Sequence, residues 1–179
     1  MELRVIDELQ MDAVMEAAVR AALQACFPRD REHYGRTRDW HGSAPAWTVV
    51  LQEGEAVVAH VGVVDRRIRV GGQPLRVFGP QGVCVRPEHR GKRLVDKVLS
   101  AAVDEARRRE IQWGMLFCQQ ATMRIYARTG WQEVDRTRIT RIDADGAEGP
   151  LPEGSMPMVR CAGDGQFPLG PIHLAGNDW

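Results

Sequence analysis

The chain has 179 residues and a mass of 20.0 kDa, with 44% hydrophobic and 27% charged residues. That length allows one substantial hydrophobic core but is short for two independent domains, so we expect a single domain over residues 1–179. Lysine and arginine together number 24, as do aspartate and glutamate, and this balance gives no reason to expect a nucleic acid or an anionic membrane as partner.

Metal sites, disulfides and membrane spans are not expected. The four cysteines are scattered without a CxxC pair, and the five histidines form neither HxxxH nor HxH. The first residues lack a charged-then-apolar leader, and no apolar run approaches the roughly 20 residues that cross a bilayer. We therefore expect a reduced, cytoplasmic protein that binds no metal.

The first half of the chain predicts one helix and then strands. Apolar residues recur with a helical period over residues 11–26, with Asp12 placed to cap the helix and Pro28 to close it. Residues 28–45 are polar and predict a loop or short irregular helices. Strands are predicted at 47–52, 56–69 and 75–85, with a hairpin turn at 53–55 and a bulge near Gly79, Pro80 and Gly82.

The second half alternates helices and strands. Residues 94–109 have the pattern of an amphipathic helix. A strand at 111–118, a helix at 121–128 and a strand at 131–142 follow, then a polar loop at 143–154, a last strand at 156–161 and a surface tail at 162–179. This order predicts a mixed α/β fold, with a largely antiparallel sheet, flanking helices and one parallel crossover.

The segment between the strand at 82–85 and the helix from residue 94 is rich in arginine and lysine and contains Gly91. A helix N-terminus offers unpaired N–H groups and partial positive charge, so phosphate groups bind there. Gly91 allows close backbone approach to an anion. Spacing alone leaves two interpretations open, a phosphate site or an ordinary strand-turn-helix corner with a solvated basic loop.

Two motifs resemble those of the GNAT acetyltransferases. Val83-x-Val85-x-Pro87-x-x-Arg90-Gly91-x-x-Leu94 resembles the family's pyrophosphate-binding motif, and Ile125-Tyr126-Ala127-Arg128-Thr129-Gly130-Trp131 is similar to its second landmark. The resemblance implies a GNAT-like α/β fold and acetyl-CoA as cosubstrate. It also implies that acetyl-CoA is bound by Val83, Cys84, Val85, Arg90, Gly91, Lys92, Arg93, Leu94 and Val95, with the N–H groups of Val83 and Val85 facing the pantetheine and the acetyl carbonyl.

A narrower resemblance concerns the acceptor. Arg90-Gly91-Lys92-Arg93-Leu94-Val95 is similar to a form found in aminoglycoside 2′-N-acetyltransferases, which also carry a strand like residues 59–67 and a terminal tryptophan like Trp179. Asp39-Trp40-His41-Gly42 resembles a stretch of the rhizobial nodulation acyltransferases. The first resemblance implies acetylation of an aminoglycoside 2′-amine, and hence antibiotic resistance.

The resemblance also suggests catalytic roles. Tyr126 occupies the family's general-acid position, which supplies a proton to the leaving thiolate. Gln81 stands where these enzymes have glutamate, and an amide accepts no proton near neutral pH. The proton acceptor is then the terminal carboxylate of Trp179, the side chain of Asp178 or water, and we expect both residues to fold back into the acceptor site.

An aminoglycoside is a polycation, so its pocket needs carboxylates and an aromatic face for the sugar ring. The candidates are Asp30, Glu32, Asp39, Trp40 and Asp178. The missing carboxylate at Gln81 suggests an acceptor with few amines, such as kasugamycin. Two alternatives stay open: an acyltransferase for another amino sugar or metabolite amine, and a non-catalytic acetyl-CoA sensor. The family resemblance also suggests a homodimer.

Overall fold

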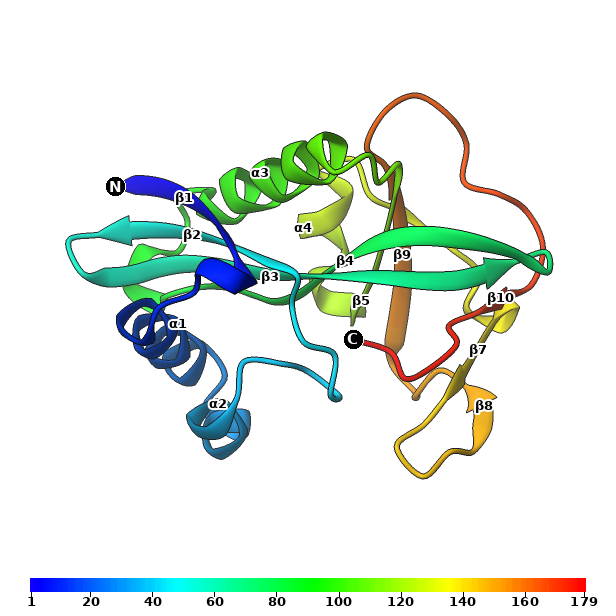
Figure 1. Cartoon of the computed structure of the whole chain (residues 1–179), viewed down its shortest axis with the longest axis horizontal. Coiled ribbons are helices and arrows are strands. Elements are labelled where there is room, and N and C mark those ends of the chain that lie inside the picture. The colour runs from blue at the N-terminus through cyan, green and yellow to red at the C-terminus, as the bar shows by residue number, and fades with distance from the viewer. The chain divides into compact units, whose positions relative to one another are not determined.

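The computed structural model describes residues 1–179, and Figure 1 shows the course of the chain. Its residues fall into two compact units. The first unit comprises residues 1–64 and 80–105, and the second comprises residues 65–79 and 106–179. The long strands β3 (Ala56–Val70) and β4 (Gln73–Val85) contribute residues to both units.

The first unit is built on β1 (Glu2–Asp7), β2 (Trp47–Glu53), residues 56–64 of β3 and residues 80–85 of β4. β2 pairs antiparallel with both β1 and β3. The helices are α1 (Ala13–Cys26), α2 (Arg31–Arg36) and most of α3 (Leu94–Arg108), and Figure 1 shows α1 and α3 on opposite sides of these strands. Short 3-10 turns lie at Glu8–Gln10, Pro28–Asp30 and Pro87–His89.

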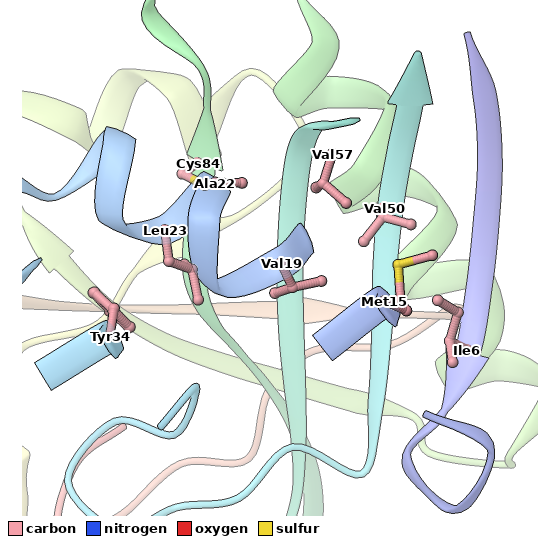
Figure 2. Packing of buried hydrophobic residues seen from close by; sticks show 9 residues of the cluster. All are labelled: Ile6, Met15, Val19, Ala22, Leu23, Tyr34, Val50, Val57 and Cys84. Atoms are coloured by element: carbon pink, nitrogen blue, oxygen red, sulfur yellow. The ribbon is translucent and has the colours of Figure 1, made fainter. Parts of the chain in front are cut away.

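Helix α1 forms as its sequence predicts. The side chain of Asp12 caps it by accepting from the N–H of Met15 at 2.8 Å. Its apolar face packs into a buried cluster with side chains from the strands and from α2, as Figure 2 shows. This cluster comprises Ile6, Met15, Val19, Ala22, Leu23, Tyr34, Val50, Val57 and Cys84. Because Cys84 belongs to this cluster, the core of the first unit reaches the C-terminal end of β4.

Strand β1 is an element that the sequence pattern did not predict. Of its six residues only Ile6 is buried. It forms because its backbone pairs with β2 from Glu2↔Gln52 to Asp7↔Trp47, and not because it buries an apolar face. Such an edge strand has no clear alternation of apolar and polar residues to mark it.

The second unit is a sheet in the order β6-β9-β5-β4-β3-β10-β7-β8. Its further strands are β5 (Trp113–Gln119), β6 (Gln132–Glu133), β7 (Ile139–Ile142), β8 (Glu148–Pro150), β9 (Ser155–Cys161) and β10 (Ile172–His173). The short helix α4 (Met123–Ala127) follows a 3-10 turn at Gln120–Thr122. The pairs β4–β5 and β10–β7 are parallel, and the pairs β3–β10, β5–β9, β6–β9 and β7–β8 are antiparallel. The predicted fold class, a mixed α/β fold with a mostly antiparallel sheet flanked by helices, is confirmed.

Three predictions for this region were wrong. Residues 131–142 are not one strand, because the Asp135 side chain accepts from the N–H of Thr137 at 2.9 Å and starts a 3-10 turn at Arg136–Arg138 between β6 and β7. The loop predicted at 143–154 contains β8. The tail at 162–179 does not simply lie over the surface, since Ile172, Leu174 and Trp179 are buried.

The C-terminal segment is held by arginine side chains that donate to its backbone. Arg138 donates to the carbonyl of Gly170 at 2.6 Å, and Arg66 donates to that of Asn177 at 2.9 Å. These bonds join residues far apart in sequence, so no local sequence pattern predicts them.

None of the helices combines the length and apolar character that a membrane span requires.

Candidate active site

The predicted acetyl-CoA segment lies wholly in the first unit. β4 ends at Val85, the turn Pro87–His89 follows, and α3 begins at Leu94. Gly91 has φ +80°, and a Cβ there would meet no heavy atom within 4 Å. The N–H groups in the first turn of a helix have no acceptor within it, and they carry partial positive charge. The open backbone at Gly91 therefore leads into a helix start that can bind phosphate.

The protein fixes this segment at its two ends. Arg86 donates from its backbone N–H to Val58 at 2.9 Å and from Nε to the carbonyl of Val57 at 2.7 Å. Leu94 anchors the other end in the core, with 4% of its surface exposed. Between these anchors Lys92 and Arg93 are exposed and available to an anion.

Cys84 can serve a ligand through its backbone but not as a thiolate. Its side chain is buried against α1, beside Ala22 in Figure 2. The hydrogen bond with Cys26, and then burial, hold the pKa of the Cys84 thiol well above its ordinary value. Its thiol stays protonated, while Val83 and Val85 on either side are only half-buried.

The side chain of Gln81 links β4 to a loop earlier in the chain, and we call this link the Gln81 clamp. This side chain is buried, its Nε2 donates to the carbonyl of Ser43 at 2.7 Å, and its Oε1 accepts from the N–H of Trp40 at 3.0 Å. The loop that carries Asp39 and Trp40 is thereby tied to β4 two residues before Val83. Both polar ends of the amide are engaged by backbone.

The predicted acceptor residues of the first unit lie on α2 and on that loop. The Trp40 ring stacks on Tyr34, with 6.0 Å between ring centroids, and lies 5.0 Å from the His41 ring. Glu32 forms an exposed ion pair with Arg36. Asp30 and Asp39 are half-buried and form no ion pair. These two carboxylates can therefore attract a cation without giving up a partner.

Tyr126 is in the second unit, in the short helix α4. Its carbonyl accepts from the N–H of Thr129 at 2.8 Å and from that of Trp131 at 3.2 Å, which closes the helix. Gly130 follows with φ +86°, a conformation typical of a helix end. The tyrosine side chain is half-buried on a backbone that these bonds hold in place.

Trp179 and Asp178 are docked within the second unit. The indole Nε1 of Trp179 donates to the carbonyl of Met115 at 3.3 Å, and the ring meets Phe117 edge-on with centroids 5.0 Å apart. The guanidinium of Arg66 lies 5.0 Å from the indole centroid. Asp178 is buried and lies 3.7 Å from Arg141. Both residues are packed against the protein, and their place in an acceptor site stays a prediction.

The indole of Trp179 lies where two parallel strands stop pairing. The pairing of β4 with β5 covers Val77↔Trp113 and Phe78↔Gly114, so Gly79 and Met115 are the next residues on each strand. A Cβ on Gly79 would lie 2.7 Å from Cδ1 of Trp179 and closer still to Nε1 and Cε2. Gly79 is therefore required for space, and the indole occupies the volume of the missing side chain.

The sequence does not reveal the contacts of three residues. It marks Gly79 only as an irregularity in a strand and Arg66 only as part of a strand that resembles one of the family. His60 is one histidine among five in the sequence. A charged or titratable residue within the apolar run at 56–64 was the available signal, because such a residue is seldom buried without a partner.

The match to a family of known proteins decides the class. The family model of the acetyltransferase (GNAT) domain matches residues 7–134. The chain belongs to the GNAT acetyltransferase family. The matched region contains the predicted acetyl-CoA segment and Tyr126.

Several solved structures have the same fold. A GCN5-related N-acetyltransferase from Anabaena variabilis matches with a TM-score of 0.60 and 19% identity, over 74% of this chain and 32% of that chain. This chain thus spans about a third of that protein. ElaA from Escherichia coli matches with a TM-score of 0.64 and 13% identity, over 89% and 98% of the two chains. A GNAT acetyltransferase from Brucella melitensis, in complex with acetyl-CoA, matches with a TM-score of 0.61 and 16% identity, over 96% of this chain and 94% of that chain.

His60 gives this acetyltransferase an acid-sensitive stability. Burial lowers the pKa of His60 to about 4, from 6.5, so the folded protein binds this proton less well than the unfolded chain does. The free energy of unfolding is therefore highest above pH 6.5 and falls as the pH drops toward 4. Between pH 7 and pH 4.5 we expect this histidine to remove about 2 kcal/mol.

Urea unfolding of the wild type and of His60→Asn at both pH values measures this loss. All other titratable groups are present in both proteins. The difference between the two losses isolates His60, and equal losses would contradict the prediction.

Proposed function

We propose that the protein transfers the acetyl group of acetyl-CoA directly to an amine of an aminoglycoside, the 2′-amine, and so confers resistance. The observation that carries the proposal is the clamp formed by Gln81. It ties the loop bearing Asp39 and Trp40 to β4, two residues before Val83, with hydrogen bonds of 2.7 and 3.0 Å. A carboxylate without an ion pair thus lies on a segment fixed to the acetyl-CoA strand.

The donor half of the proposal rests on the segment from Val83 to Val95. Its helix start and basic side chains suit the pyrophosphate of acetyl-CoA, and the Brucella neighbour was solved with that molecule. Gly82 has φ +56°, a conformation outside that of a regular strand. We propose that this local irregularity leaves the N–H of Val83 available to the thioester carbonyl.

The transfer needs no covalent enzyme intermediate. The neutral amine nitrogen attacks the thioester carbon, and the carbonyl oxygen gains negative charge beside the N–H of Val83. The carbon–sulfur bond then breaks, and the leaving thiolate takes a proton from the hydroxyl of Tyr126. The amine proton passes to water or to a carboxylate of the C-terminal segment, since the amide of Gln81 accepts no proton.

The acceptor is proposed to be a small amino sugar with few amines, of which kasugamycin is an example. Of the five predicted acceptor residues, Asp39 combines a half-buried carboxylate without an ion pair with a neighbouring indole. Asp178 is already paired with Arg141, and Glu32 with Arg36. We therefore assign the first contact with the acceptor cation to Asp39.

The test is thiol release from acetyl-CoA with kasugamycin, tobramycin, spermidine and free amino acids, with the product located by mass spectrometry. We expect turnover with an aminoglycoside. In Asp39→Asn we expect the KM for that acceptor to rise by about tenfold or more, as expected for a lost charge-assisted hydrogen bond, with the KM for acetyl-CoA unchanged.

Glu32→Gln is the matched control, because its carboxylate is already paired and exposed. Turnover confined to polyamines or amino acids would replace the proposal with a metabolite acetyltransferase. Acetyl-CoA binding without turnover of any amine would favour a sensor.

A further inference from the structure

His60 lies on β3, and its imidazole lies next to Gly82 of β4, within the first unit. Its ring is buried, with 1% of its surface exposed, and its Nδ1 lies 2.8 Å from the carbonyl oxygen of Gly82. A carbonyl oxygen can only accept a hydrogen bond, so Nδ1 carries the proton. The other ring nitrogen, Nε2, is buried and has no hydrogen-bond partner.

Burial keeps this ring neutral. It lowers the pKa of His60 to about 4, with a further lowering by the charge of Arg38, and the carbonyl of Gly82 opposes this only in part. At neutral pH the histidine is therefore uncharged, with its single ring proton on Nδ1. A neutral, buried imidazole forms no ion pair and is poorly suited to taking up a proton at neutral pH. Neither role therefore explains why a histidine is buried at this position.

The carbonyl that His60 holds belongs to the same peptide plane as the N–H of Val83. In a trans peptide these two groups point in opposite directions, and the plane is rigid. A hydrogen bond that fixes the Gly82 oxygen on one side therefore aims the Val83 N–H to the other side. Gly82 can accept this orientation because its φ is +56°, which a residue with a Cβ rarely adopts.

Packing reinforces the arrangement. A Cβ on Gly82 would lie 3.2 Å from Cδ2 of Leu23 and 3.4 Å from Cε1 of His60. Gly82 is thus packed against a core side chain and against the imidazole that is hydrogen-bonded to its carbonyl. The peptide between Gly82 and Val83 has little freedom to rotate back into a regular strand.

We infer that His60 is a positioning residue for acetyl transfer: by holding the carbonyl of Gly82 it aims the N–H of Val83 at the acetyl carbonyl of bound acetyl-CoA. The inference rests on the proposed function only in taking acetyl-CoA as the donor, and it is independent of the acceptor. An N–H group that already points at the acetyl carbonyl polarises the thioester and does not have to reorient during the reaction.

The test uses two variants that separate the ring nitrogens. In His60→Asn the side-chain amide nitrogen takes the place of Nδ1 and keeps the bond to Gly82. In His60→Gln the amide nitrogen takes the place of Nε2 and loses it. We measure the carbonyl stretching frequency of bound acetyl-CoA, carrying a ¹³C label in the acetyl carbonyl, by infrared difference spectroscopy in the absence of any acceptor.

We expect a shift to lower frequency on binding to the wild type and to His60→Asn, and a clearly smaller shift with His60→Gln. The Kd of acetyl-CoA should change less than about threefold, since the pyrophosphate contacts are untouched. With an acceptor in hand, kcat should fall by about 10- to 100-fold in His60→Gln and be restored in His60→Asn. A merely structural histidine would lower the thermal stability of both variants and leave the frequency of the bound carbonyl unchanged.

Equal carbonyl shifts in the folded wild type and folded His60→Gln would overturn the inference. If His60→Gln does not fold, nitrogen NMR of the wild-type imidazole decides, because the inference requires the proton on Nδ1. A proton on Nε2 would overturn it. Failure to find an amine acceptor would count against the proposed function and leave the infrared result valid.

Discussion

Replacing Tyr126 with phenylalanine is expected to lower kcat by about a hundredfold or more, because the leaving thiolate loses its proton donor. The substitution removes one hydroxyl and keeps the ring. The backbone of α4 is held through the carbonyl of Tyr126, which accepts from Thr129 at 2.8 Å, and that bond does not involve the side chain. We therefore expect the KM for acetyl-CoA and the melting temperature to change little.

The other tyrosine of the chain is the matched control. Tyr34 is buried in the core of the first unit, as Figure 2 shows, and burial raises its pKa. Tyr34→Phe should leave kcat within about twofold, since it lies outside the proposed machinery. Steady-state thiol release with the preferred acceptor measures both variants. Equal kcat values for Tyr126→Phe and Tyr34→Phe would rule out Tyr126 as the acid.

Replacing Gly79 with alanine is expected to destabilise the protein by about 3 kcal/mol, because the new methyl group and the indole of Trp179 need the same space. A Cβ at Gly79 would lie 2.7 Å from Cδ1 of Trp179. The indole must then leave its place and give up its bond to the carbonyl of Met115. Urea unfolding followed by circular dichroism measures the change.

A double-mutant cycle tests whether the clash with Trp179 is the cause. Trp179→Ala alone should cost about 3 kcal/mol or more through the loss of a buried aromatic ring. In that background Gly79→Ala should add less than about 1 kcal/mol, because the clash is gone. Simple addition of the two costs would contradict the explanation. Gly149→Ala is the control, since a Cβ there meets nothing within 4 Å.

Much of the first unit could be predicted from local sequence rules. A capping aspartate and a helical apolar period predicted α1, and the basic, glycine-containing corner before α3 was compatible with a phosphate site, which the family motif then favoured. Both patterns act over a few residues, where capping, helix dipoles and periodic burial operate. The pyrophosphate motif lies in this unit and the second family motif, around Tyr126, lies in the second unit. Both are short runs of neighbouring residues, so the class of protein could be read without the structure.

The acceptor side could not be read this way. The sequence named Gln81 for its chemistry, as an amide in place of a carboxylate, and named Trp179 for its terminal position. In the structure Gln81 bonds to a loop 41 residues earlier, and Trp179 to a strand 64 residues earlier. Such partners follow from how distant segments pack, and no period or short motif specifies them.

The sequence by itself thus determined the family and predicted the donor segment and the role of Tyr126, because each depends on residues that are neighbours along the chain. Only the tertiary structure decided that Gln81 clamps a loop, that Gly79 makes room for an indole and that His60 holds the carbonyl of Gly82. The physical reason is the same in each case. A buried polar group or a large ring must find its partner or its space in three dimensions, and that partner comes from elsewhere in the chain.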